Sequence, residues 1–235
     1  MNKRVVITGL GVMAPNGTGL ESFSSAIAHG KSGIQFIQEL EDYNFACKIG
    51  GIPDISKSKY LKYLSQYELS EADTSIQYAV LAGLEAWFDA SLEIPDYEKN
   101  DTYDDFGVIV GTCYGGTEIF IRKIFPLVSS GNTKKLGSQI VEHWMPSGSA
   151  AALSKIFALA NQTTANSSAC STGTEAISMA FERIKNVKAK LMLAGGTDPY
   201  SPYCWAGFDS MRLLCRAYNQ TPEAASRPMS NTAKG

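Results

Sequence analysis

The residue best suited to do chemistry is Cys170, in the stretch SSACSTG. The Thr- and Ser-rich segment 162–169 before it is expected to be extended, and 173–185 after it has the apolar spacing of a helix. A side chain on a sharp turn from strand to helix is exposed above the sheet. The N–H groups and dipole of the helix N-terminus favour a thiolate, the reactive form of cysteine. A small, inert buried thiol is the alternative interpretation.

The elements that must position Cys170 alternate between strand and helix. Strands are expected at 4–8, 106–110 and 190–194, with the β-branched run 4–8 as a buried first strand. Helices are expected at 20–29, 74–88, 117–125 and 173–185. Asp73 is expected to cap the second of these helices. This alternation predicts an α/β fold with a mostly parallel sheet.

Composition excludes several classes of protein. The chain has 235 residues, 44% of them hydrophobic, and a formal charge of −2, which is unfavourable for nucleic-acid binding. No apolar run approaches the roughly 18 residues of a membrane span, and Gly9, Gly11 and Pro15 interrupt a segment that imitates a signal peptide. Five cysteines without a CxxC pair predict free thiols in a reducing, cytoplasmic compartment and no metal site.

Several motifs, taken in order, resemble one family. VVITGLGVMAPNG, GTCYGG, SSACSTG, LMLAGGTD, AGFDSMRLL and AASRP are similar to segments of the β-ketoacyl-[acyl carrier protein] synthases, the condensing enzymes of the thiolase-like superfamily. The resemblance implies a thiolase-like α/β fold with helices on both faces of a mixed, mostly parallel sheet. It implies that 1–235 is the family's N-terminal domain, truncated before the C-terminal half, and that copies dimerise through segment 162–169.

The resemblance also implies site residues, substrates and partners. Cys170 would accept an acyl chain as a thioester from the phosphopantetheine of an acyl carrier protein, and its backbone N–H would form part of the oxyanion hole. Condensation with malonyl-[acyl carrier protein] in fatty-acid or polyketide synthesis would follow. Tyr114 and Phe208 would line the acyl pocket, with ordinary core packing as their alternative. No cofactor, metal, nucleic acid or membrane span is implied, and a homodimer or heterodimer with a ketosynthase-like subunit is expected.

The chain departs from the family at its histidines. The family's two catalytic histidines lie in motifs absent here, because His29 and His143 match neither motif. The isolated chain is therefore expected to lack condensing activity. A lone half would also expose apolar surface that the other half covers, so it is expected to aggregate or to be marginally stable.

Three alternatives remain. A non-catalytic partner subunit of the chain-length-factor type is one, although such subunits usually lack the cysteine that this chain retains. A cysteine hydrolase using Cys170 and His143 is another. The pattern G-x-G-x-x-A at 9–14 is the third, a dinucleotide fingerprint that Pro15 disfavours because the turn must open a helix.

Overall fold

The computed structural model describes residues 4–96 and 102–234, and the chain divides into two compact units. The first unit comprises the described residues of Met1–Gly11 and Tyr60–Pro199, and the second comprises Val12–Lys59 and those of Tyr200–Gly235. The second unit is therefore built from segments far apart in the sequence.

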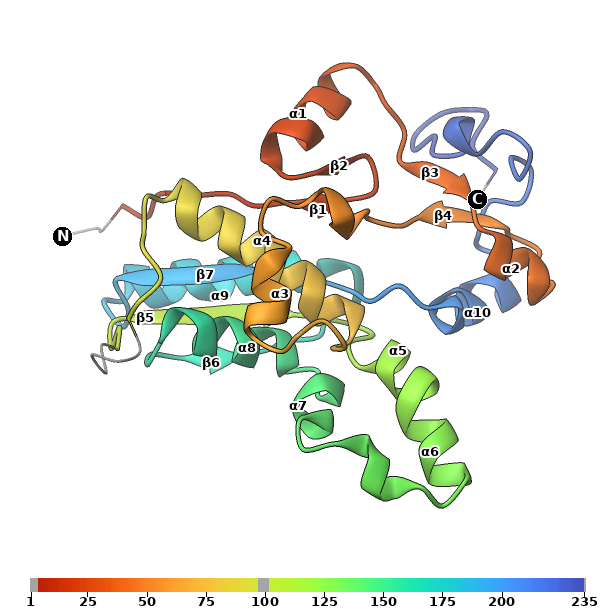
Figure 1. The fold of residues 1–235 in the computed structure, drawn as a ribbon. Helices are drawn as coiled ribbons and strands as arrows, with labels where there is room; N and C mark the ends of the chain where they lie inside the picture. The colour runs from red at the N-terminus through yellow and green to blue at the C-terminus, as the bar shows by residue number, and fades with distance from the viewer. Residues whose placement is uncertain (1–3, 97–101, 235) are drawn as a thin grey trace. The chain divides into compact units, whose positions relative to one another are not determined.

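A parallel three-stranded sheet forms the centre of the first unit, in the order β6–β5–β7 (Figure 1). These strands are β5 (Phe106–Gly111), β6 (Thr163–Thr164) and β7 (Leu191–Gly196). In the central strand Val108 and Ile109 are 0% and 1% exposed. A continuous apolar run such as FGVIV is typical of a strand that is buried on both faces.

Helices cover both faces of this sheet. Helix α9 (Thr172–Lys185) packs on β5 and β7, and α8 (Gly148–Phe157) packs on β5 and β6 with α4 (Thr74–Asp89) against it. Because side chains alternate along a strand, Met192 and Ala194 face α9 while Leu193 lies near Gly83 of α4. The predicted parallel sheet with helices on both faces is confirmed.

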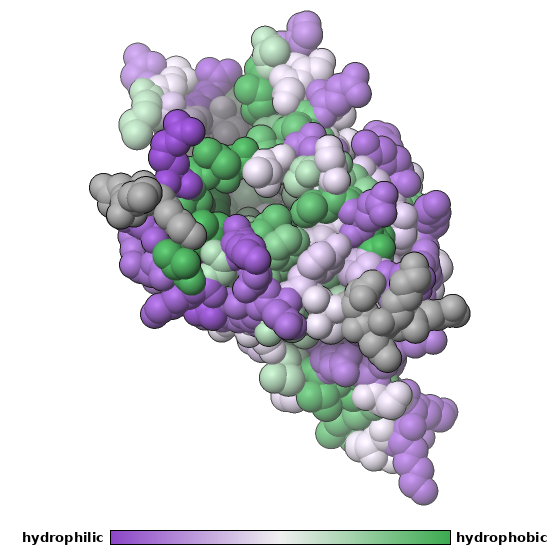
Figure 2. Space-filling model, turned by 90° about the vertical axis from the view of Figure 1, so that its left-hand side faces the viewer, coloured by the Kyte–Doolittle hydropathy of each residue, from purple (hydrophilic) through white to green (hydrophobic). Residues whose placement is uncertain are grey.

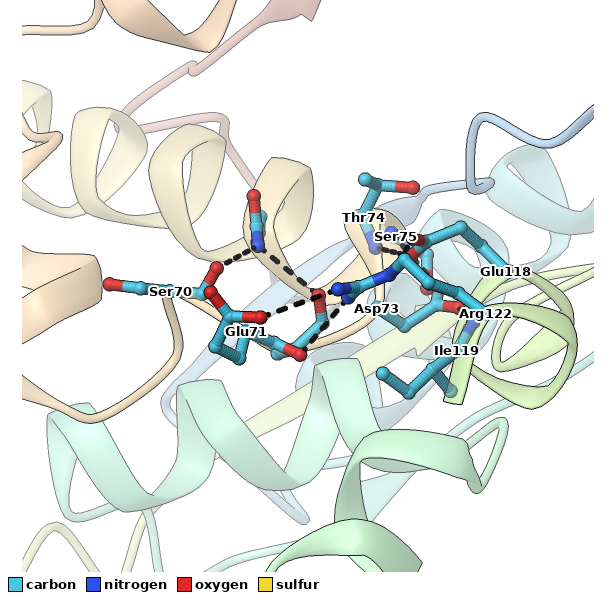
Figure 3. A network of polar contacts seen from close by, with 10 residues as sticks. Ser70, Glu71, Asp73, Thr74, Ser75, Glu118, Ile119 and Arg122 are labelled. Atoms are coloured by element: carbon cyan, nitrogen blue, oxygen red, sulfur yellow. Dashed lines mark hydrogen bonds and ion pairs between the residues drawn. The ribbon is translucent and has the colours of Figure 1, made fainter. Parts of the chain in front are cut away.

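Helix α4 begins in a polar network that ties it to α5 (Thr117–Ile119), as Figure 3 shows. Asp73 accepts hydrogen bonds from the N–H of Ser75 and of Ile119, both at 3.1 Å. Glu118 in turn accepts from the N–H of Thr74 at 3.2 Å. Each carboxylate thus satisfies a backbone donor at the start of the other's helix, and the predicted Asp73 cap is confirmed.

The remaining elements of the first unit are short. A chain of helical segments leads from the end of β5 to α8, and the helix predicted at 117–125 forms its first part. After α5 come a π-helical stretch (Phe120–Ile124), α6 (Phe125–Ser129), a 3₁₀ turn (Thr133–Leu136) and α7 (Ile140–Trp144). Helix α3 (Lys62–Gln66) lies earlier in the chain and precedes α4.

The second unit contains two small antiparallel sheets. One is the hairpin of β1 (Met13–Ala14) with β2 (Gly17–Thr18), and the other pairs β3 (Ile34–Phe36) with β4 (Ile49–Gly51). Asp209 accepts from the N–H of Ala46 and of Cys47, both at 3.0 Å, and so joins segments 162 or more residues apart. Its helices are α1 (Leu20–Ala28), α2 (Gln38–Asp42) and α10 (Pro202–Ser210), with 3₁₀ turns at Ile55–Lys57 and Pro222–Ala224.

One predicted strand is wrong, and one predicted extended segment pairs over part of its length. Segment 4–8 forms no strand, and Val6 and Ile7 are 68% and 79% exposed, because no strand among the described residues pairs with it. It continues into Gly9 and Gly11, where a Cβ would collide with the backbone of α4. Segment 162–169 forms a strand at Thr163–Thr164, and the N–H groups of Val108 and Thr112 donate to the carbonyls of Gln162 and Asn166 on either side, so the segment runs beside β5 only as far as 166.

Apolar side chains also reach the surface. Figure 2 shows green patches between hydrophilic ones on the face drawn there. On α9, Ala176 and Ala180 are buried, but Ile177 and Phe181 are 56% and 41% exposed. The amphipathic pattern of 173–185 predicts these four residues and Ile184 on one side of the helix, and of the five the structure buries only the two alanines. No helix within the described ranges is both long and apolar enough to cross a membrane.

Candidate active site

Cys170 lies in a 3₁₀ turn (Ala169–Ser171) that leads directly into α9. Of the five cysteines, Cys170 is exposed, Cys47 is buried and the other three are intermediate. The turn follows β6 and stands at the carboxyl end of the sheet, the edge where parallel α/β sheets bind ligands. The predicted position between an extended segment and a helix start is therefore observed, and the alternative of a buried thiol is wrong.

The residue before Cys170 has an unusual backbone. Ala169 has φ +52°, in the left-handed region that residues with a Cβ seldom adopt. Its carbonyl accepts a hydrogen bond from the hydroxyl of Thr172 at 2.7 Å, and the thiol of Cys113 lies 3.1 Å from the same oxygen. Thr172 also accepts from the N–H of Ser168 at 2.9 Å. Side chains on both flanks thus hold the strained residue in place.

A second set of bonds fixes the segment entering this turn. The amide of Asn166 donates to the carbonyl of Thr172 at 2.9 Å and to the carboxylate of Glu175 at 2.8 Å. The hydroxyl of Ser168 donates to the same carboxylate at 2.5 Å. The hydrogen bonds from Ser168 and Asn166 hold the pKa of Glu175 below its usual value. Glu175 is therefore an anion that ties the first turn of α9 to the chain before Cys170.

The turn after β5 lies against the Cys170 turn. One carboxylate oxygen of Asp198, Oδ1, accepts from the hydroxyl of Thr112 at 2.9 Å and from the N–H groups of Cys113 and Tyr114 at 2.8 and 3.0 Å. Sequence analysis missed Asp198 and Cys113, although LMLAGGTD and GTCYGG contain them. The available signal was a carboxylate two residues after a strand that ends in two glycines.

Of the three predicted site residues, Cys170 and Tyr114 lie in turns that contact each other. Tyr114 follows Cys113 in the turn beside Cys170, and its side chain is 39% exposed. Phe208 belongs to α10 of the second unit and is 40% exposed. Neither residue has the burial that ordinary core packing would give. Pocket lining by Tyr114 and Phe208 remains a sequence-based prediction.

Neither histidine is bonded to Cys170. His29 ends α1 in the second unit, where its Nδ1 lies 2.8 Å from the carbonyl of Ser25. His143 is 7% exposed in α7, and burial is the main reason that its pKa lies below the usual value. No hydrogen bond joins His143 to Cys170 in the described ranges, which removes support for a hydrolase pair.

The other alternative sites gain no support. The glycines at 9 and 11 lead into the β1–β2 hairpin, whereas a dinucleotide fingerprint would open a helix there. The dinucleotide fingerprint at 9–14 therefore lacks the helix that it requires. Within residues 4–96 and 102–234, His, Cys, Asp and Glu side chains form no group of three that could hold a metal ion.

Comparison with known proteins agrees with this geometry. The family model described as "Beta-ketoacyl synthase, N-terminal domain" matches residues 2–234. The chain is 33% identical over 227 residues to 3-oxoacyl-[acyl-carrier-protein] synthase 2 of Vibrio harveyi, covering 96% of this chain and 53% of that protein. It thus spans about half the length of this curated relative.

Solved structures share the fold. An acyl-carrier protein in complex with its type II polyketide ketosynthase, AntDE:AntF, matches with a TM-score of 0.82 at 25% identity, over 100% of this chain and 55% of that one. The ishigamide ketosynthase/chain length factor matches with a TM-score of 0.73 at 21% identity, over 90% and 51%. The chain belongs to the β-ketoacyl synthase family and has the thiolase-like fold of its N-terminal half.

Proposed function

We propose that Cys170 accepts an acyl group as a thioester during fatty-acid or polyketide synthesis. The sulfur of Cys170 attacks the carbonyl carbon of an acyl-phosphopantetheine thioester. A new C–S bond forms, the old one breaks, and the phosphopantetheine thiol leaves with the proton. The single observation that supports this role is the exposed Cys170 on a strained turn at the start of α9, in a chain of this family.

The second half-reaction needs groups that this chain does not supply. Malonyl-[acyl carrier protein] would lose CO₂, and its carbanion would attack the acyl carbonyl, forming a C–C bond and releasing the Cys170 sulfur. Donors must stabilise the developing enolate. His29 is exposed in the second unit and His143 is buried in α7, and neither matches the family's histidine motifs. We infer that this chain accepts acyl groups and does not condense them by itself.

The carrier and the quaternary structure belong to the same proposal. The donor of the acyl group is an acyl carrier protein, and the chain works in a homodimer or in a heterodimer with a ketosynthase-like subunit. Among the solved relatives, AntDE:AntF is an acyl-carrier protein in complex with its ketosynthase, and the ishigamide protein is a ketosynthase/chain length factor. The alternative is a non-catalytic subunit of the chain-length-factor type. The retained cysteine at position 170 favours the enzyme.

Site-resolved alkylation separates the enzyme from the non-catalytic subunit. The folded chain is treated with limiting iodoacetamide, and each cysteine peptide is quantified by mass spectrometry. We expect Cys170 to be modified first, and prior acylation by octanoyl-coenzyme A to block modification of Cys170 alone. Alkylation of Cys170 at the rate of Cys204 and Cys215, with no protection by the thioester, would support the non-catalytic subunit.

A condensation assay tests the second part. The pure chain is incubated with octanoyl-coenzyme A and malonyl-[acyl carrier protein], and the carrier is analysed for a 3-oxoacyl product. We expect acyl-Cys170 to accumulate without product. Steady formation of 3-oxoacyl carrier by the chain alone would refute the need for further histidines.

A further inference from the structure

We propose that Asp198 and Cys113 are positioning residues that set the direction of the Cys170 backbone N–H. This inference rests on the proposed acyl transfer and adds two residues to it. Neither residue needs to touch the substrate. Asp198 acts on the turn that carries Cys113, and Cys113 acts on the peptide group that joins Ala169 to Cys170.

The geometry of one peptide group carries the argument. The carbonyl of Ala169 and the N–H of Cys170 belong to the same planar trans peptide, so they point in opposite directions. Fixing the carbonyl therefore fixes the N–H. No atom of the described residues accepts a hydrogen bond from this N–H. It is left available for the negative oxygen that develops when the Cys170 sulfur attacks a thioester.

Two side chains fix that carbonyl. The hydroxyl of Thr172, the first residue of α9, donates to it at 2.7 Å. Cys113 comes from a different part of the chain, and its sulfur lies 3.1 Å from the carbonyl oxygen and 3.3 Å from the Thr172 hydroxyl oxygen. Its single S–H proton can go to either oxygen, and either bond braces the left-handed Ala169 from outside.

Asp198 determines where Cys113 stands. Its Oδ1 accepts three hydrogen bonds from consecutive residues of the 112–114 turn, two of them from backbone N–H groups. Bonds to a carboxylate are the stronger kind. Because Asp198 is exposed and follows β7, it adds little to the packing of the core. Its three bonds instead hold the Cys113 turn against the Cys170 turn.

The test compares two reactions of the same sulfur. Acyl transfer from octanoyl-coenzyme A needs both the thiol and the oriented N–H, whereas alkylation by iodoacetamide needs only the thiol. We expect Asp198→Ala to slow single-turnover acylation about tenfold with an unchanged half-saturating concentration, and Asp198→Asn to recover part of the rate. We expect Cys113→Ala to slow it about threefold and Cys113→Ser to restore it. Cys170 alkylation should stay within about twofold throughout.

Controls separate the possible failures. Asp105→Ala removes an exposed carboxylate just before β5 and should leave acylation unchanged. Should Asp198→Ala unfold, the Cys113 pair carries the test alone. If the wild-type chain is acylated and both Asp198→Ala and Cys113→Ala are acylated at the wild-type rate, the positioning inference is overturned and the proposed function stays intact. Absence of acylation in the wild-type chain would overturn both.

Discussion

Asp73 and Asp198 are two carboxylates of the first unit that each accept three hydrogen bonds, yet they lie in opposite surroundings. Asp73 is 0% exposed and bonds Ser75, through its N–H and its hydroxyl, and the N–H of Ile119. Asp198 is exposed and bonds three consecutive residues of one turn. The first joins two helix starts inside the core, and the second holds a surface turn beside Cys170.

The difference lies in what each carboxylate replaces. Without Asp73, water cannot reach the buried donors, so its hydrogen bonds bear on global stability. Without Asp198, water can solvate the freed N–H groups, but the turn loses its fixed direction. Similar bonding therefore has two consequences, stability in the core and geometry at the site. Substitutions at Asp73 and at the Cys170 site should therefore separate a loss of stability from a loss of geometry.

Asp73→Ala is expected to destabilise the protein most. The change leaves the N–H of Ile119 and of Ser75 buried without acceptors, at a cost of about 3 kcal/mol in the free energy of unfolding. Denaturant unfolding followed by circular dichroism measures it. Asp198→Ala is the matched control and should cost less than about 1 kcal/mol. Equal losses in the two variants would erase the contrast.

Gly111→Ala is expected to damage the site with a smaller loss of stability. A Cβ at Gly111 would lie 2.4 Å from Thr172 Cγ2 and from Asn166 Oδ1, so the Cys170 turn must shift. We expect about 2 kcal/mol of destabilisation and a drop in acylation of about tenfold. Gly195→Ala, on the neighbouring strand, is the matched control because its Cβ would meet nothing within 4 Å. Unchanged acylation in Gly111→Ala would argue against a tightly held turn.

Tyr114→Ala is expected to alter selectivity with little effect on stability. The side chain is 39% exposed, so its removal should change the free energy of unfolding by less than about 1 kcal/mol. If Tyr114 limits the acyl pocket, the variant should accept longer acyl thioesters. Competition between octanoyl- and palmitoyl-coenzyme A, read as acyl-Cys170 by mass spectrometry, measures the preference. An unchanged product ratio would remove Tyr114 from the pocket.

His143 predicts a mild pH dependence of stability. Burial, with Lys123 as the second cause, lowers the pKa of His143 below its usual 6.5. Between these two pKa values the unfolded chain binds more protons than the folded one, so stability rises with pH there and is lost on acidification. Unfolding midpoints measured from pH 7 to about pH 5 should fall less in His143→Gln. Identical slopes would contradict this origin.

Local signals made part of the fold predictable. Asp73 before an apolar periodic stretch predicted the start of α4, because a cap and its helix are contiguous. The run 4–8 was misassigned as a strand because its apolar, β-branched residues indicate a preference for burial in a sheet. A strand also needs a hydrogen-bonded neighbour, and none of the described strands pairs with 4–8. In α9 the exposure of Ile177 and Phe181 has the same cause, since helical spacing predicts a face but not what packs on it.

The site was predictable only in its centre. Cys170 and the turn around it lie in one short motif, so the sequence located them. The contacts that hold the turn join residues far apart, Cys113 to Ala169 across 56 positions and Asp198 to Cys113 across 85. No local pattern encodes such pairs, because they arise from the adjacency of β5, β6 and β7. Aggregation of the isolated chain stays a prediction, and the exposed apolar side chains on α9 are consistent with it.

The most direct test is to map the acyl adduct. The chain is mixed with octanoyl-[acyl carrier protein], quenched in acid and digested, and all five cysteine peptides are compared with those of Cys170→Ala. We predict one octanoyl group, on the peptide containing Cys170 and absent from the variant. An adduct spread over several cysteines, or an unmodified Cys170 in a folded chain, would contradict the role assigned to this sulfur.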